Sequence, residues 1–184
     1  MATAYISYYD VINEQKVRGL MQACAEVLAQ HKPTQLYFLF SSQGGSVDAG
    51  VSLFNFLRAL PIPIVMHNTG SINSIANTIF LAADERYANA NSSFLFHGIT
   101  WSFGQGAQLS WTQLQETVSN FKGEETKLFS IISQRTKLSL EELKALFHQG
   151  EAKDTAFALD KGIIQAVKEA KVPVGAPFFS LNFQ

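Results

Sequence analysis

Residues 36–66 read LYFLFSSQGGSVDAGVSLFNFLRALPIPIVM, and this stretch indicates the fold class. Residues 36–40 and 62–66 are continuously apolar, as strands covered on both faces of a sheet are. Between them, a Gly-Gly turn precedes Ser46, a helix-capping residue, and apolar side chains then recur at helical spacing up to Leu57. A strand, a helix and a second strand in this order predict a parallel sheet with the helix packed outside it.

The same alternation continues on both sides of this stretch. Residues 5–9 form a short strand, and a helix capped by Asn13 follows until Pro33 ends it. Downstream, the pattern predicts a helix over about residues 73–82 and a short strand at 94–96. The expected fold class is therefore α/β.

A long helical pattern over residues 111–137 dominates the second half of the chain. Its apolar residues recur in steps of three and four, at Trp111, Leu114, Val118, Phe121, Leu128 and Ile132. This seam binds another helix, within the subunit or across an interface, or it lies on the chain's own sheet. A capping box at Ser139, a helix over 154–161 and a strand over 163–167 are expected after it.

The amino-acid composition limits the classes of protein to which this chain can belong. The chain has 184 residues, 47% of them hydrophobic and 16% charged, with a formal net charge of −1. These values predict one domain over residues 1–184 and exclude a disordered chain or an obvious nucleic-acid binder. Fifteen Phe residues are more apolar surface than one small domain easily hides, which favours an oligomer. With one cysteine, no signal-peptide pattern and no membrane-length apolar run, a cytoplasmic protein without a membrane span is expected.

Three segments stand at the ends of predicted strands, where open α/β sheets collect their ligands: residues 41–47, 70–77 and 93–98. In the first, the backbone amides of Gly44 and Gly45 lie at a helix start and can hold a developing oxyanion. The alternative for this segment is a plain tight turn between strand and helix.

The second and third segments offer a nucleophile and a base. Ser71 or Ser74 can project from a sharp turn into a cleft, or each can merely cap the next helix. His97 ends an apolar strand, where a neutral imidazole can take the proton of a serine hydroxyl, or it can be structural. His67, near the serine loop, is open to both readings. The four histidines lack metal-site spacing and companion cysteines, so neither a metal nor another cofactor is expected.

In order and spacing, these segments resemble the Clp protease proteolytic subunit (ClpP) family of the crotonase-like superfamily. The resemblance rests on QGGSVDAG at residues 43–50, GSINSIA at 70–76 and FLFH at 94–97. It extends from about residue 4 to residue 167 and includes a histidine 23 residues after the serine at 74. A long helical insertion after the histidine belongs to the same pattern.

The resemblance implies an α/β subunit of repeated β-β-α units with a protruding handle helix, here about residues 111–137. In the family this helix joins two rings into a barrel with the active sites inside. A ring-forming homo-oligomer, peptide or unfolded-protein substrates and an ATP-dependent unfoldase partner are implied with it. The C-terminal tail, about residues 172–184, has no assigned role and either docks on a neighbour or moves freely.

The resemblance also implies a serine endopeptidase. Carried over by position, Ser74 is the nucleophile and His97 the general base. The oxyanion hole is then formed by the amides of Ile75 and of Gly45 or Gly44. An acyl-CoA enzyme of the wider crotonase type also uses paired amides, but the serine–histidine pair disfavours it.

Three departures from the family pattern affect these expectations. The place of the family's acid holds Gly150, so a serine–histidine dyad and a triad closed by Glu151 are both open. Since loss of the orienting acid can cost about 10⁴ in turnover, the alternative function is a weak or inactive structural subunit of a mixed ring. Gln43 stands where the family has Pro. The family's N-terminal axial segment is expected to be absent or to span three or four residues, which weakens the case for an unfoldase.

Overall fold

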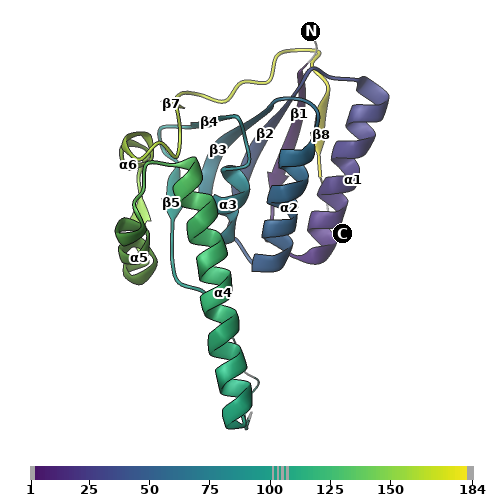
Figure 1. Cartoon of the computed structure of the whole chain (residues 1–184). Helices are drawn as coiled ribbons and strands as arrows, with labels where there is room; N and C mark the ends of the chain where they lie inside the picture. The colour runs from purple at the N-terminus through teal and green to yellow at the C-terminus, as the bar shows by residue number, and fades with distance from the viewer. Residues whose placement is uncertain (1–2, 101, 103, 105, 107, 182–184) are drawn as a thin grey trace.

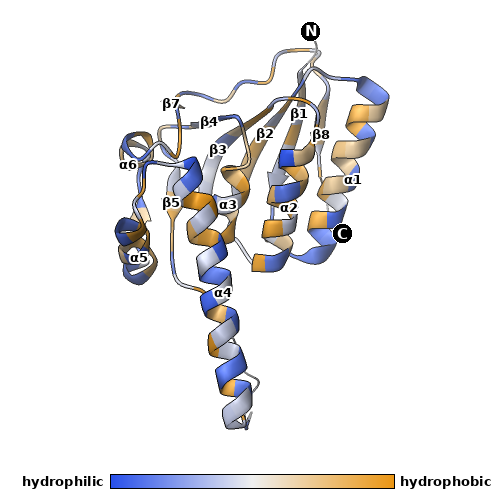
Figure 2. Ribbon diagram, in the orientation of Figure 1, coloured by the Kyte–Doolittle hydropathy of each residue, from blue (hydrophilic) through white to orange (hydrophobic). Residues whose placement is uncertain are grey.

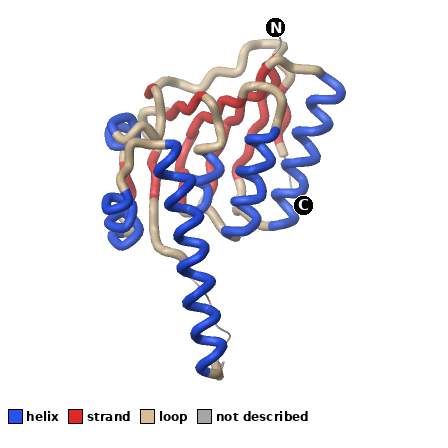
Figure 3. The backbone as a smooth tube through the Cα atoms, viewed as in Figure 1, coloured by secondary structure: helices blue, strands red, loops and turns tan. Residues whose placement is uncertain are grey.

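The structure, a computed structural model, describes residues 3–100, 102, 104, 106 and 108–181. These residues form a sheet with helices on one face and beside one edge (Figures 1 and 3). The strands are β1 (Thr3–Tyr9), β2 (Gln35–Ser42), β3 (Ile64–Asn73), β4 (Glu85–Ala88), β5 (Ser93–Leu95), β6 (Ala152–Lys153), β7 (Ala166–Val167) and β8 (Phe178–Ser180). The helices are α1 (Glu14–His31), α2 (Val47–Ala59), α3 (Ile75–Phe80), α4 (Trp111–Arg135), α5 (Leu140–Gln149) and α6 (Thr155–Asp160).

The sheet has the order β6-β5-β3-β2-β1-β8, and β4 pairs with both β3 and β7. The pairs are parallel except for β5 with β6, which is antiparallel. The predicted parallel sheet with helices outside it is thereby confirmed. Strand β4 is followed by β5 and then by α4, which gives a β-β-α run in this part of the chain.

The helix starts follow the capping residues of the sequence. The Asn13 side chain accepts a hydrogen bond from the Lys16 amide, and the Ser46 side chain accepts one from the Ala49 amide. Each satisfies a backbone donor that has no partner within its helix. Below α1 and α2, the buried face of β2 presents Phe38 among other apolar side chains, and the sheet and helices share one apolar core.

Strand β3 is longer than the 62–66 expected, and α3 is shorter than the expected 73–82. The reason is a change of partner along the strand: residues 65–68 pair with β4, and residues 71–73 pair with β5. This second pairing keeps the chain extended up to Asn73. The nucleophile candidate at position 74 therefore lies at a strand end.

Helix α4 divides the apolar seam into two parts. Leu128 and Ile132 are buried in the core of the subunit. Trp111, Leu114 and Val118 are exposed by 72%, 41% and 50%, on the part of α4 that projects beyond the sheet (Figure 1). Figure 2 shows that polar residues dominate the rest of this projecting part. One part of α4 thus packs on the core of the subunit, while the apolar stripe on its other part is exposed.

The C-terminal segment adds a strand that was not expected. Residues 178–180 form β8, parallel to β1, and the Tyr5 amide donates to Pro177 O at 2.8 Å. The strand expected over 163–167 shortens to β7. Within the described part of the chain, no helix combines the length and apolar character needed to span a bilayer.

Candidate active site

Ser74 occupies a strained turn between β3 and α3. Its backbone torsions are φ 57° and ψ −131°, in the region that L-residues rarely adopt, at a cost of about 1–3 kcal/mol. The Ser74 amide donates to Leu95 O at 2.8 Å, which fixes the turn to the end of β5. The Ser74 hydroxyl does not cap α3. Its side chain is therefore free of a capping role, and the strand–turn–helix setting is that of a nucleophile elbow.

Ser71, the other serine of this segment, has a structural environment. Its amide donates to Ser41 Oγ at 3.1 Å, and its hydroxyl lies 3.2 Å from Ser93 Oγ. Ser71 belongs to β3 and does not line the cavity that Ser74 lines. These contacts favour Ser74 of the two.

The glycine loop packs directly against the Ser74 turn. A Cβ at Gly44, where φ is +88°, would lie 2.7 Å from both Ser74 Cβ and Asn73 O. The Gly44 amide already donates to Ser42 Oγ at 3.1 Å. Among the described residues, by contrast, no hydrogen bond uses the amide of Gly45 or of Ile75. Of the two glycine candidates, Gly45 is therefore the one whose amide is available to donate a hydrogen bond to an oxyanion.

The side chain of Gln43 connects this loop to β3. Its Oε1 accepts a hydrogen bond from Asn73 Nδ2 at 2.6 Å. Asn73 is the residue immediately before Ser74. A side-chain contact thus links the glycine loop to the serine turn.

His97 is oriented by a backbone carbonyl. Its Nδ1 lies 2.8 Å from Gly98 O, and since a carbonyl only accepts, Nδ1 carries the proton of the neutral ring. Nε2 is then left as the acceptor. The Gly98 amide in turn donates to Phe147 O at 2.9 Å, which connects the His97–Gly98 peptide to α5.

Ser74, His97, Gly45 and Ile75 line one cavity of about 60 Å³. Within the described structure, no hydrogen bond joins the Ser74 hydroxyl to the His97 ring, a contact that often tightens only when substrate is bound. The cavity is small against the roughly 300–1,000 Å³ of ligand pockets. A ligand of ordinary size must therefore extend beyond the cavity and place only a part of itself inside it.

The place opposite His97 is occupied by Gly150. This residue closes α5 in the left-handed conformation, with φ 61°, and a Cβ built on it would lie 3.9 Å from His97 Cβ. Glu151, the candidate acid, does not line the cavity. Its carboxylate pairs with Lys153 Nζ at 3.0 Å, and its side chain is 67% exposed. Position 150 therefore lies next to the Cβ of His97 in this structure.

His67 belongs to a buried network away from the cavity. Its Nε2 lies 2.9 Å from Asn89 Oδ1 and 3.0 Å from Lys168 O, and its Nδ1 lies 2.6 Å from Tyr37 Oη. The two oxygens near Nε2 accept, so this nitrogen carries the proton and Nδ1 accepts from the tyrosine. Burial lowers the pKa of His67 and keeps the ring neutral. Its environment is structural.

Sequence reasoning missed Asn77. This residue is 1% exposed within α3, where its Nδ2 donates to Ser74 O at 3.1 Å and to Leu95 O at 2.8 Å. The available signal was a polar amide in the otherwise mostly apolar hexapeptide IANTIF, residues 75–80.

Among the described residues, no group of three His, Cys, Asp or Glu side chains is placed to hold a metal ion.

Comparisons with known proteins concern the family and the fold of this chain. Residues 1–171 match the model of the Clp protease family. ATP-dependent Clp protease proteolytic subunit 2 of Treponema pallidum (strain Nichols) is 27% identical over 148 residues, covering 79% of this chain and 71% of that subunit. Proteolytic subunit 2 of Treponema denticola is 34% identical over 88 residues, covering 47% of this chain and 42% of that subunit.

A solved structure confirms the predicted ClpP-like α/β fold with its long helix. A point mutant of ClpP1 from Listeria monocytogenes superposes with a TM-score of 0.76 and covers 92% of each chain. At 19% sequence identity, this match speaks for the fold alone. The chemistry has to be argued from the side chains of this chain.

Proposed function

Because this chain belongs to the Clp protease family, we propose that it is a serine peptidase with Ser74 as nucleophile and His97 as general base. One observation carries the proposal. The strained serine turn, the imidazole and the uncommitted amides of Gly45 and Ile75 all border the same cavity. This is the set of groups that acyl transfer needs: a nucleophile, a base and donors for the oxyanion.

The reaction follows from these positions. His97 Nε2 takes the proton of the Ser74 hydroxyl as its oxygen attacks the carbonyl carbon of a peptide bond. The oxyanion that forms accepts hydrogen bonds from the Gly45 and Ile75 amides. The imidazolium then gives its proton to the leaving amine, and an acyl-enzyme remains. Water, deprotonated by the same Nε2, attacks the ester carbonyl and releases Ser74.

In this proposal a backbone carbonyl orients His97, the role that a carboxylate has in a catalytic triad. Gly98 O holds His97 Nδ1 and thereby selects the tautomer with a basic Nε2. A neutral carbonyl stabilises the imidazolium less than a carboxylate does, so we expect slow turnover. Glu151 remains a candidate acid only if its pair with Lys153 opens.

The absence of a carboxylate from the described hydrogen bonds of His97 supports one alternative function, a catalytically weak or inactive structural subunit of a mixed ring. The two functions differ in the reactivity of Ser74. A subunit that serves only as a structural partner needs no activated serine. Measuring that reactivity therefore separates them.

A fluorophosphonate probe should label the purified protein, and mass spectrometry should locate the adduct on Ser74. We expect the Ser74→Ala variant to lose the label completely. The Ser71→Ala variant should keep it, since Ser71 lies outside the cavity. An unlabelled protein, under conditions that label an active relative, would support the structural subunit. An adduct on Ser71 would overturn the assignment of the nucleophile.

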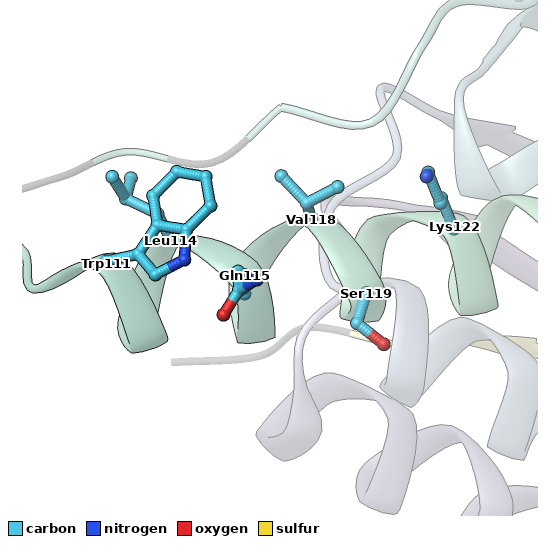
Figure 4. Close-up of a pocket in the computed structure, with 6 residues that line it drawn as sticks. All are labelled: Trp111, Leu114, Gln115, Val118, Ser119 and Lys122. Carbon is cyan, nitrogen blue, oxygen red and sulfur yellow. The ribbon is translucent and has the colours of Figure 1, made fainter.

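We further propose that α4 pairs with the same helix of a second copy, and that the resulting assembly restricts the active site to peptides and unfolded segments. Trp111, Leu114 and Val118 lie along one side of α4 and border a hollow of about 430 Å³ (Figure 4). The similar proteins are named as subunits of ATP-dependent proteases. An ATP-driven unfoldase is accordingly the further partner to test.

The α4 pairing predicts a large effect of charge on one side of the helix only. Val118→Glu places a carboxylate in the apolar stripe, and we expect the molar mass from sedimentation velocity to fall to that of a smaller species. Asn120→Glu adds the same charge about 200° around the helix, and it should leave the mass unchanged. Equal masses for the two variants would contradict this mode of assembly.

A further inference from the structure

The buried amide of Asn77 connects the two halves of the candidate active site. Its Nδ2 donates to Ser74 O, in the nucleophile turn, and to Leu95 O, at the end of β5. Leu95 O also accepts the Ser74 amide at 2.8 Å. Leu95 stands two residues before His97. One side chain thus joins the segment that carries the serine to the segment that carries the base.

The orientation of this amide is defined by its partners. Both groups next to Nδ2 are carbonyls, which only accept, so the nitrogen must face them. Oδ1 is buried and, within the described structure, has no hydrogen-bond partner. A buried polar atom left unpaired costs free energy, and native structures contain few of them. An apolar residue at this position would avoid that cost, so the two donated hydrogen bonds need a role that offsets it.

The peptide plane shows what that role is. In a trans peptide, the carbonyl oxygen and the amide hydrogen point in opposite directions. A hydrogen bond that points Ser74 O toward Asn77 therefore points the Ile75 N–H away from Asn77. The Ile75 amide is one of the two proposed oxyanion donors. The Asn77 backbone amide also donates to Ser74 O at 3.1 Å, and the side-chain Nδ2 adds a second donor that is itself fixed to Leu95 O.

From these contacts we infer that Asn77 is a positioning residue for the peptidase site. It aims the Ile75 amide at the oxyanion and fixes the spacing between the Ser74 turn and the strand end that leads to His97. It touches neither substrate nor reacting atoms. This inference rests on the proposed serine peptidase function, and it assigns to Asn77 an effect on the rate of the chemical step.

Two variants test the inference by removing the donors stepwise. Asn77→Ala removes both hydrogen bonds, and kcat for a peptide substrate should fall by about 10- to 100-fold, with KM changed less than twofold. Asn77→Ser keeps a short donor that can reach Ser74 O three residues earlier but cannot reach Leu95 O. Its kcat should lie between those of the wild type and the Ala variant. The rate of fluorophosphonate labelling should follow the same order.

A destabilised control separates positioning from simple loss of structure. Leu20 lies on the buried face of α1 and does not line the cavity, so Leu20→Ala should lower the melting temperature without touching the site. We expect its kcat and labelling rate to stay at the wild-type level. Wild-type rates in both folded Asn77 variants, or a fall in the Leu20 variant equal to theirs, would overturn the inference. If the wild type itself is not labelled, the proposed function fails first, which is a separate result.

Discussion

Replacing Gly150 by Asp should raise the rate of peptide hydrolysis at least tenfold, up to a ceiling of about 10⁴. A Cβ at this position would lie 3.9 Å from His97 Cβ, so a carboxylate on it can replace Gly98 O as the acceptor for His97 Nδ1. The negative charge then stabilises the imidazolium that forms when Ser74 is deprotonated. Measurement of kcat/KM with a fluorogenic peptide gives the size of the gain.

The matched control is Gly150→Asn. Asn has the same shape as Asp, and both tolerate the left-handed conformation of this position at a cost of about 1 kcal/mol. Without a charge, the Asn variant should hydrolyse the peptide at close to the wild-type rate. Equal rates for the Asp and Asn variants would show that the missing carboxylate does not limit this site. Glu151→Gln, measured beside them, should stay within about twofold of the wild type, because Glu151 pairs with Lys153.

The second large effect is expected at the glycine loop. In Gly44→Ala, the new methyl group would lie 2.7 Å from Asn73 O and Ser74 Cβ, at a φ of +88° that disfavours any side chain. Either the loop moves outward, with the Gly45 amide, or the serine turn is displaced. Loss of one oxyanion donor costs about 10²–10³ in kcat, and we expect a fall of that size.

Gly123→Ala is the control for this substitution. Gly123 lies within α4, and a Cβ built there has no neighbour within 4 Å. Since Ala favours a helix over Gly by about 1 kcal/mol, this variant should be slightly more stable and equally active. If Gly44→Ala retained wild-type kcat with a folded circular dichroism spectrum, the glycine loop would have no part in catalysis.

Features set by neighbours along the chain were predictable from the sequence. The caps at Asn13 and Ser46 and the start of α4 at Trp111 involve residues three or four positions apart. Ser74 and His97 were placed at strand ends because their segments follow apolar runs. The division of the α4 seam into a buried part and an exposed part was not predictable, because a stripe of apolar residues does not show what packs against it.

Features set by distant contacts were not predictable. The extension of β3 to Asn73 depends on its pairing with β5, some twenty residues later in the chain. The choice between the two glycine amides depends on the rotamer of Ser42, whose hydroxyl occupies the Gly44 amide. Asn77 gave only a weak signal, because a polar residue in a short apolar helix has meaning only once its acceptors on other segments are known.

The pairing of β8 with β1 has a consequence for synthesis of the protein. Strand β1 is synthesised before its outer partner β8, which lies about 170 residues later in the chain. At roughly 5–20 residues per second, the nascent sheet carries an unpaired β1 edge for on the order of ten to thirty seconds. During that interval the unpaired edge of β1 is open to pairing with a strand of another chain.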